Sequence, residues 1–334
     1  MARRVEDQVV VVTGASSGVG RAIARAFGAR GAKVGLIARN GEALENAAHE
    51  MVSAGGEGLA LPLDVSDAGS VQRAADEVVA RWGRIDTWIN DAMVSVFSPV
   101  SQMTPEEFHR VTEVTYLGTV YGTLAALRHM RDRDEGTIIQ IGSALAYRSI
   151  PLQSAYCAAK AAIRGFTDSL RSELIHDGSR VRLSMLQLPA LNTPQFDVVR
   201  SRLPRRPQPV PPIYQPEIVA RAALRVAEHP TRELWVAGSA WKAIVGQRLI
   251  PGLLDRYLAR KGYDAQQTSE PAEPGRPDNL DAPLPGDRGA HGRFDERSRR
   301  KSLELWARLH PGSLAAGLAA AALLTAGLGA RGLR

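Results

Sequence analysis

Three polar residues in the middle of the chain have types and a spacing suited to proton transfer. Tyr156 and Lys160 stand four apart in the segment AYCAAKAAIRGF, so on a helix they lie on the same face. An ammonium near a phenol stabilises the phenolate and is expected to lower the pKa of the tyrosine, so that it can give or take a proton. Ser143, thirteen residues earlier, ends the apolar run GTIIQIGS. A tyrosine and a lysine at this spacing are often only structural, so the hypothesis depends on what surrounds them.

A glycine-rich loop lies near the N-terminus, between an apolar run and a helix-like segment. The sequence TGASSGVG occupies residues 13–20 and completes the run VVVVT. Gly14 permits a sharp exit from a strand, Gly18 lets a ligand approach the backbone, and Gly20 lets a helix pack closely on the sheet. Free N–H groups at the start of that helix attract a pyrophosphate. We therefore predict a dinucleotide site whose loop contacts are Gly14, Ser16, Ser17, Gly18, Val19 and Gly20.

The end of the second apolar run indicates which dinucleotide binds. An acidic residue there would accept from a ribose 2′-hydroxyl, but the chain has Ala38, Arg39 and Asn40. A guanidinium suits a 2′-phosphate, and a solvated surface arginine is the plainer alternative. The sequence favours NADP(H) over NAD(H), with Arg39 and Asn40 as contacts.

Apolar strand-like runs alternate with helical segments through the first 240 residues or so. Strands are expected at 9–13, 33–38, 59–63, 87–90, 136–143, 181–188 and 233–236, and helices at about 18–30, 42–54, 66–82, after 104, and through 156–176. Continuous apolar strands separated by helices are typical of a parallel sheet covered on both faces. This predicts an α/β fold with a doubly wound parallel sheet of the Rossmann type, in a single catalytic domain followed by a C-terminal extension. Ser143 then lies at the carboxyl edge of the sheet, where open α/β sheets bind ligands.

Together these motifs resemble the short-chain dehydrogenase/reductase family, in its classical type. The matching pieces span residues 5 to about 240 and are TGASSGVG, LPLDV, NDAM, Ser143 and the Tyr156/Lys160 pair. The resemblance implies hydride transfer between a nicotinamide and a carbonyl or carbinol carbon, with Tyr156 as acid/base, Ser143 holding the substrate oxygen and Lys160 binding ribose. It implies further cofactor contacts from Asp64, Val65, Asn90, Ala92, Pro189 and Thr193. It also implies a homo-oligomer, a dimer or a tetramer.

Three positions depart from the family's pattern. Met93, in NDAM, puts a bulky side chain where the family has glycine against the cofactor. Thr115, in VTYLG, aligns with the family's catalytic asparagine, and its short hydroxyl competes for its own backbone. Pro189 is followed by Ala190 instead of glycine. These departures support a second hypothesis, a nucleotide-sensing or scaffold protein that has lost turnover. The intact serine, tyrosine and lysine favour an enzyme acting on CH–OH or C=O groups.

The second part of the chain is rich in proline. Residues 200–216, RSRLPRRPQPVPPIYQP, are expected to lack regular secondary structure and to form either a lid over a ligand cleft or a plain surface loop. The catalytic domain is expected to extend over residues 1–263, including this segment. Residues 264–296 are rich in Pro, Gly, Asp and Arg. This composition predicts a linker that is either disordered or lies along the wall of the domain.

Residues 297–334 combine a basic segment with an apolar tail. Residues 311–330 carry no charge and are long enough to span the ~30 Å hydrocarbon core of a bilayer, although alanine and glycine dominate them. Two interpretations of this tail remain open. It is either a membrane anchor or an Ala/Gly-rich segment that forms a helix or is disordered. A basic run precedes the tail and would favour the cytoplasmic side or bind anionic lipid; it comprises Arg297, Arg299, Arg300, Lys301 and Arg308. We expect a cytoplasmic protein, with membrane contact and a lipophilic substrate if the tail is an anchor.

The net charge of +7 belongs to the second part of the chain. Residues 1–199 carry 20 basic and 22 acidic side chains, whereas residues 200–334 carry 22 and 13. Prolines are interspersed with these basic residues, and no sequence motif for nucleic-acid recognition accompanies them. No nucleic-acid partner is therefore expected. The single cysteine, Cys157, excludes an internal disulfide and is expected to be a buried structural thiol. The histidines lack metal-ligand spacing, so no metal is expected, and the N-terminus lacks the apolar core of a signal peptide.

Overall fold

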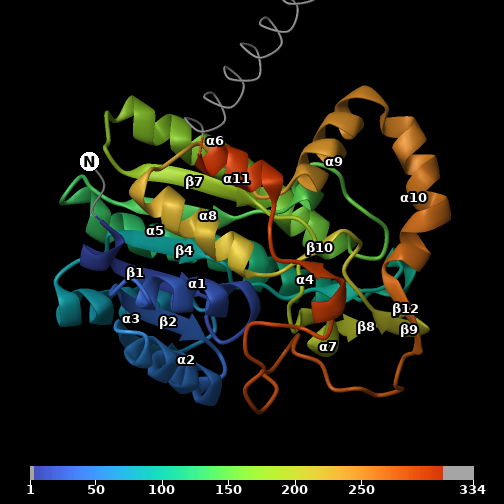
Figure 1. The fold of residues 1–334 in the computed structure, drawn as a ribbon, viewed down its shortest axis with the longest axis horizontal. Helices are drawn as coiled ribbons and strands as arrows, with labels where there is room; N and C mark the ends of the chain where they lie inside the picture. Colours follow the sequence, from blue (N-terminus) through green and yellow to red (C-terminus); the bar gives the residue numbers. More distant parts are fainter. Residues whose placement is uncertain (1–3, 311–334) are drawn as a thin grey trace, which may run out of the picture.

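The computed structural model describes residues 4–310 and contains a seven-stranded parallel sheet (Figure 1). The strand order is β11-β7-β6-β4-β1-β2-β3, and every neighbouring pair runs parallel. The order reverses direction at β1, which confirms the doubly wound Rossmann-type fold. The strands are β1 (Val9–Thr13), β2 (Lys33–Ala38), β3 (Glu57–Pro62), β4 (Thr87–Asn90), β6 (Thr137–Ile141), β7 (Arg182–Gln187) and β11 (Glu233–Trp235).

Helices cover both faces of the sheet. One face is packed by α1 (Gly18–Gly28), α2 (Gly41–Ser53) and α8 (Glu217–Glu228). The other is packed by α3 (Ala68–Trp82), α4 (Pro105–Val111), α5 (Gly118–Arg131) and α6 (Ser154–His176), with a π-helical turn at Thr112–Leu117 between α4 and α5. The helices begin where the sequence supplies caps: the side chain of Asn40 accepts from the amide of Ala43, and Thr104 forms a capping box with Glu107.

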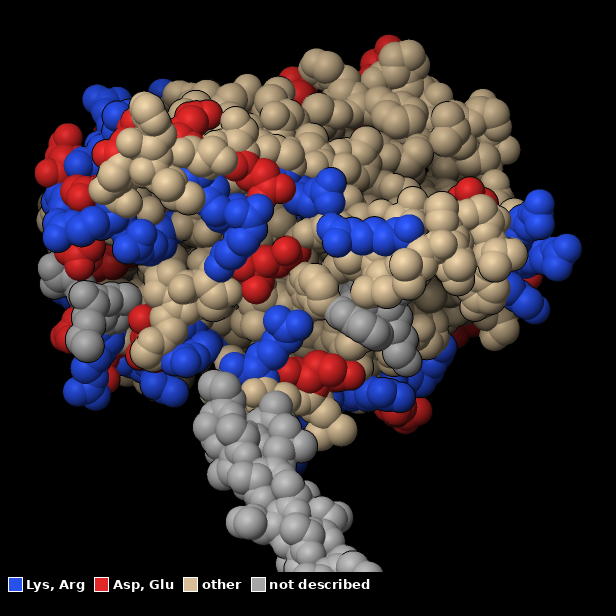
Figure 2. All heavy atoms as spheres, turned by 90° about the horizontal axis from the view of Figure 1, so that it is seen from above, with Lys and Arg blue, Asp and Glu red and all other residues tan. Residues whose placement is uncertain are grey.

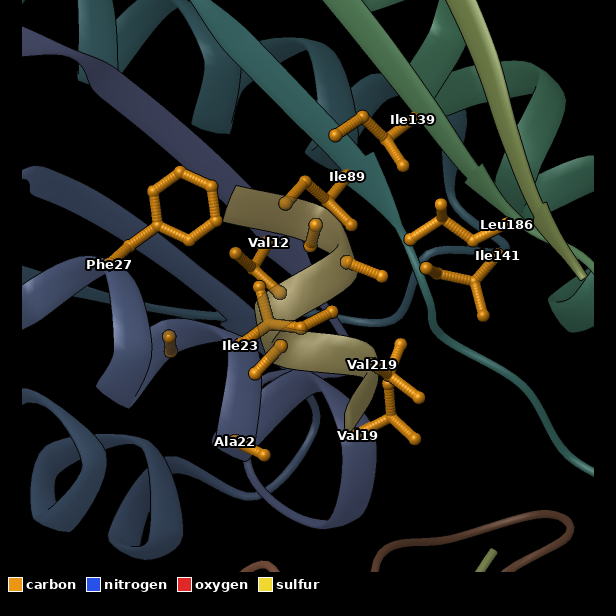
Figure 3. Close-up of a cluster of buried hydrophobic side chains, with 14 of the residues drawn as sticks. Val12, Val19, Ala22, Ile23, Phe27, Ile89, Ile139, Ile141, Leu186 and Val219 are labelled. Carbon is orange, nitrogen blue, oxygen red and sulfur yellow. The ribbon is translucent and has the colours of Figure 1, made fainter. Parts of the chain in front are cut away.

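The core on the first face lies between the sheet, α1 and α8 (Figure 3). Ile23 and Phe27 of α1 point toward Val12 of β1, and Val219 of α8 lies beside Val19 (Figure 3). All five residues of β1 are buried, because a central parallel strand has no solvent face. Burying a side chain such as Phe27 contributes roughly 1.5–3 kcal/mol, so the sheet is a rigid support for the loops at its carboxyl edge.

The proline-rich segment 200–216 contains short strands, so the expectation of no regular secondary structure was wrong. It holds β8 (Arg200–Ser201), β9 (Arg205–Pro207) and β10 (Ile213–Tyr214). Each pairs with a segment far away in the chain: β8 with β5 (Val96–Phe97), β9 with β12 (Gln267–Pro271), and β10 with β13 (Ser298–Arg299). Two-residue ladders need few donors, so the neighbouring prolines are tolerated at their ends.

The predicted linker 264–296 lies along the wall of the domain, and the disordered alternative was wrong. After β12 the chain passes α7 (Gln195–Val198) and runs toward the starts of α1 and α2 (Figure 1). Residues 276–297 of this path are called the strap below. Leu280 of the strap is fully buried in the core, and Arg200 pairs with Asp278 at 2.8 Å and with Asp281 at 2.7 Å. Sequence composition missed this order because each anchor joins residues far apart in the chain.

Six arginines of residues 200–310 form ion pairs: Arg200, Arg202, Arg205, Arg206, Arg232 and Arg293. Arg205 pairs with Asp264, and Arg206 with Glu270 and Asp197. Figure 2 shows one face of the molecule, on which basic and acidic side chains are interspersed and do not gather in one basic patch. Some of these pairs, such as Arg200 with Asp278 and Arg206 with Glu270, hold the extension against the domain.

Three helices complete the described chain. Helices α9 (Gly238–Leu249) and α10 (Pro251–Ala265) form an arm beside the domain, and α11 (Leu303–Leu309) packs on α8 (Figure 1). The short turns are 3-10 helices at Val5–Asp7, Val100–Gln102, Ala144–Ala146 and Asp295–Arg297. Among residues 4–310 there is no helix both long and apolar enough to cross a bilayer. The apolar tail 311–330 lies outside the described residues.

Candidate active site

The glycine loop between β1 and α1 forms a cradle that larger residues would fill. Gly14 and Gly18 have φ of +75° and +58°, a conformation that side chains other than glycine rarely adopt. A Cβ on Gly14 would come within 3.0 Å of the backbone of Ala92, and one on Gly20 would overlap the carbonyl oxygen of Gly14. These positions require glycine for the reasons that the motif predicts, so the loop fits a dinucleotide pyrophosphate.

A groove runs from this loop along the carboxyl ends of β1, β2 and β3. Its cavity of about 200 Å³ is lined by eleven of the predicted cofactor residues: Gly14, Ser16, Ser17, Gly18, Val19, Arg39, Asn40, Asp64, Val65, Ala92 and Thr193. This cavity is called the nucleotide groove below. Pro189 lines a neighbouring cavity, as described next, while Gly20 and Asn90 line neither one.

Asn90 does not reach the groove, in contrast to its predicted role on the adenosine side. It is buried, and its side-chain amide donates to Thr123 at 3.1 Å and to Gln140 at 2.9 Å. Its side-chain oxygen accepts from the indole N–H of Trp88 at 2.8 Å. Asn90 thus joins β4, β6 and α5 below the site, and supports it only indirectly.

Asp64 and Arg39 line the end of the groove where the sequence predicts the adenosine. Burial opposes ionisation of Asp64, but hydrogen bonds from Ser66 and Arg110 hold its pKa below the usual range. Arg39 donates to the carbonyl oxygens of Asn279 and Leu280 in the strap, and its guanidinium is 4.0 Å from the carboxylate of Asp64. The predicted 2′-phosphate ligand is therefore fixed in place by the C-terminal extension.

Ser143, Tyr156 and Lys160 line one cavity of about 360 Å³, which is called the catalytic cavity below. Pro189 and Thr193 line it as well. It meets the nucleotide groove at residues that belong to both: Val19, Asp91, Met93, Thr193 and Gln195. The structure thus brings the three predicted catalytic residues together where the groove ends.

The elements around the cavity fix each of the three side chains. Ser143 caps the turn Ala144–Ala146, accepting from the amide of Leu145 at 3.1 Å, and it hydrogen-bonds Tyr156. Lys160 is one turn beyond Tyr156 on α6, with its ammonium 5.6 Å from the centre of the tyrosine ring. That ammonium donates to the carbonyl of Ile141 at 2.7 Å, which ties α6 to the end of β6.

The expected lowering of the Tyr156 pKa is not found in this structure. Desolvation within the cavity raises the pKa of Tyr156, and the hydrogen bond to Ser143 opposes this only in part. Desolvation also lowers the pKa of Lys160 to about 8. The phenol consequently holds its proton at neutral pH, as a proton donor requires.

Asp91 is a site residue that the sequence reasoning missed, although it stands in the NDAM motif. Its carboxyl group lines both cavities at the end of β4. Burial raises the pKa of Asp91 to about 7, while the charge of Lys160 and a hydrogen bond donated by the amide of Gly20 oppose the rise. An acidic side chain directly after a strand at the ligand edge was the available signal.

Thr115 is not brought to either cavity. It is fully buried in the π-helical turn, where its hydroxyl donates to the carbonyl of Val94 at 3.1 Å and accepts from the amide of Val94 at 3.2 Å. With donor and acceptor both satisfied, this hydroxyl holds the loop after β4. Met93, one residue before Val94, lines both cavities and narrows the place where they meet.

Comparison with known proteins decides the family. The family model "short chain dehydrogenase" matches residues 8–203, which contain the glycine loop and all three catalytic candidates. The chain belongs to the short-chain dehydrogenase family. It is therefore an oxidoreductase, in keeping with the carbonyl- or alcohol-directed chemistry of such a site.

Several oxidoreductases are similar to much of this chain. The uncharacterized oxidoreductase YxnA of Bacillus subtilis is 36% identical over 274 residues, which cover 81% of this chain and 77% of YxnA. D-threitol dehydrogenase of Mycolicibacterium smegmatis is 31% identical and covers 60% of this chain and 80% of its own. A solved alcohol dehydrogenase from the archaeon Thermococcus sibiricus, complexed with 5-hydroxy-NADP, is 30% identical with a TM-score of 0.59 and covers 68% of this chain and 95% of its own.

Proposed function

We propose that this short-chain dehydrogenase is an NADP(H)-dependent enzyme that transfers a hydride between the nicotinamide and a carbonyl compound or secondary alcohol. The observation that carries the proposal is the meeting of the two cavities. Ser143, Tyr156 and Lys160 line the catalytic cavity, and Val19 and Thr193 line both it and the nucleotide groove. A bound nicotinamide supplies or takes the hydride.

In this proposal Ser143, Tyr156 and Lys160 have different roles in proton transfer. Tyr156 donates its proton to the oxygen of a carbonyl substrate, or takes one from an alcohol. Ser143, hydrogen-bonded to Tyr156, orients that oxygen. Lys160, held by the carbonyl of Ile141, keeps two further N–H donors for ribose hydroxyls and stabilises the phenolate while Tyr156 lacks its proton.

The proposed NADP(H) preference rests on the side chains at the adenosine end of the groove. Arg39 provides the cation for a 2′-phosphate, and Asn40 lies beside it. Asp64 and Val65 would flank the adenine, whereas Pro189 and Thr193 would hold the nicotinamide amide. The solved alcohol dehydrogenase from Thermococcus sibiricus, complexed with 5-hydroxy-NADP, supports this assignment.

The lining of the catalytic cavity favours a largely apolar substrate. Beyond the catalytic trio its walls are mostly aliphatic or aromatic, contributed by Leu145, Ile150, Leu188, Leu191, Phe196, Val210, Tyr257 and Leu258. The prolines at 209, 211 and 212 form part of the wall, which supports the proposed lid role of segment 200–216. A small-molecule ketone or secondary alcohol with an apolar body matches such a site.

Replacing Tyr156 with phenylalanine tests the proposed function. NADPH oxidation is measured with a panel of apolar ketones, and NADPH binding is measured by fluorescence titration. We expect Tyr156→Phe to lose turnover and to keep NADPH binding. Tyr147→Phe is the matched control, because Tyr147 hydrogen-bonds Glu233 and lines neither cavity. Retained turnover in Tyr156→Phe would overturn the assignment.

One observation favours the alternative, a nucleotide-sensing protein without turnover. Thr115 stands at the position of the family's catalytic asparagine, and its hydroxyl is used by Val94. In that case the wild-type protein binds NADPH but oxidises none of it with any ketone of the panel.

A further inference from the structure

The strap lies along the nucleotide groove and forms its outer wall. Five strap residues line the groove: Asn279, Pro283, Leu284, Gly286 and Arg288. Asn40 donates its side-chain amide to the carbonyls of Leu284 at 2.9 Å and Gly286 at 3.1 Å. The amide of Gly18, in the glycine loop, donates to the carbonyl of Gly289 at 3.0 Å. The strap therefore contacts the residues that are proposed to hold the dinucleotide.

Anchors on both sides of Arg288 fix this part of the strap. Asp287 pairs with the buried guanidinium of Arg21 at 3.1 Å. Further on, the side chain of Asn192 donates to Asp295 at 2.8 Å and accepts from the amide of Phe294 at 3.0 Å. The strap lies outside residues 8–203, the part of the chain that the family model matches.

Arg288 differs from its neighbours in having no fixed partner. Among residues 4–310, no hydrogen bond or ion pair involves its exposed guanidinium, although the residue lines the groove. The groove's other basic residue is Arg39, which donates one N–H group to each of two strap carbonyls and whose charge faces Asp64. Among the described residues, no acidic side chain pairs with Arg288. The residue lies between two strap contacts, that of Gly286 with Asn40 and that of Gly289 with Gly18.

We infer that the strap completes the dinucleotide site and that Arg288 is one of its phosphate ligands. The inference rests on the proposed function, that the groove holds a nicotinamide dinucleotide. A guanidinium binds phosphate oxygens in bidentate fashion, and a phosphate is the anionic group that such a ligand brings to this groove. Because the carbonyl of Gly289 accepts from the amide of Gly18, the strap contacts the glycine loop at a residue that is proposed to lie against the pyrophosphate.

Equilibrium binding to the full-length protein tests the role of Arg288. NADPH, NADH and ADP-ribose are titrated against the wild type, Arg288→Ala, Arg288→Lys and Arg30→Ala. Arg30 is the matched control, an exposed arginine in the turn after α1. We expect Arg288→Ala to raise the Kd by about tenfold or more, Arg288→Lys to raise it less, and Arg30→Ala to leave it unchanged. A loss for all three ligands places Arg288 on the pyrophosphate, and a loss for NADPH alone places it on the 2′-phosphate.

An unchanged Kd in Arg288→Ala overturns the inference and leaves the proposed function intact. Wild-type protein that binds neither NADPH nor NADH contradicts the proposed function itself, so the two failures are distinct. Trypsin provides a second readout, because Arg288 is an exposed cleavage site. We expect NADPH to slow cleavage after Arg288 and to leave cleavage after Arg30 unchanged. Faster cleavage after Arg288 would show that the ligand expels the strap, and would contradict the inference.

Discussion

Asp91 and Lys160 line the same cavity, and each favours the charged form of the other. The charge of Lys160 lowers the pKa of Asp91 against the effect of burial, and the charge of Asp91 raises the pKa of Lys160 in the same way. Desolvation nevertheless brings both pKa values near neutrality, to about 7 and about 8. Both side chains are therefore expected to change charge near neutral pH.

Replacing Asp91 with asparagine should shift the pH dependence of turnover. Without the carboxylate, the pKa of Lys160 falls below about 8, so its ammonium is lost at a lower pH. If the ammonium is required, the alkaline limb of kcat/KM moves to lower pH, by about one unit. The measurement is kcat/KM for NADPH-dependent reduction between pH 6 and 9, in the wild type and in Asp91→Asn. An alkaline limb at the same pH in both proteins would show that Asp91 does not set the charge of Lys160.

Removing the hydroxyl of Ser143 should slow reduction and leave cofactor binding unchanged. Ser143 contacts Tyr156 and lines the catalytic cavity, but it does not line the nucleotide groove. We expect Ser143→Ala to lower kcat/KM about 10²–10³-fold, which is typical for the loss of one oxyanion-binding donor. Steady-state kinetics and NADPH titration measure the two effects separately. A parallel loss of NADPH binding would assign Ser143 a role in folding the site.

Arg39 should determine the preference between NADPH and NADH. We expect Arg39→Ala to weaken NADPH binding about tenfold more than NADH binding, since only NADPH carries the 2′-phosphate. Arg110→Ala is the matched control: Arg110 bonds Asp64 and the strap carbonyl of Leu280 but does not line the groove. It should weaken both ligands alike. Equal losses for NADPH and NADH in Arg39→Ala would leave Arg39 as an anchor of the strap.

Replacing a glycine with alanine should be harmful in the glycine loop and harmless at a glycine with open space around it. Gly20→Ala places a Cβ against the carbonyl of Gly14, and we expect it to abolish NADPH binding and to destabilise the fold by about 1–3 kcal/mol. Gly165→Ala on α6 meets nothing within 4 Å, and we expect it to stabilise the protein by about 0.5–1 kcal/mol. Urea unfolding and NADPH titration check both. Normal NADPH binding by Gly20→Ala would refute the tight loop.

The sheet and the meeting of Ser143, Tyr156 and Lys160 in one cavity were predictable because their signals are local. The run VVVVT is β1 itself, and TWIN is β4. The glycines of the loop are required by contacts within one β–α unit. Tyr156 and Lys160 share a helix face at a spacing of four residues, and the end of β6 brings Ser143 beside them.

The strap could not be predicted from the sequence, because no local pattern marks its contacts. The bond from Arg39 to Leu280 spans 241 residues, and the prolines, glycines and charges around it have a composition typical of disorder. Asn90 and Thr115 were misplaced for a related reason. Their types suit a site, and only the neighbours across the fold, such as Gln140 and Val94, show that their polar groups are already satisfied.

The most direct test of the proposed chemistry is a single turnover followed by NADPH absorbance. Wild-type protein, Tyr147→Phe and Tyr156→Phe are each loaded with NADPH and mixed with an excess of apolar ketones. We predict rapid loss of the NADPH absorbance in the wild type and in Tyr147→Phe, and no loss in Tyr156→Phe although NADPH is bound. Hydride transfer at the wild-type rate in Tyr156→Phe, or none in the wild type with any ketone, would contradict the account.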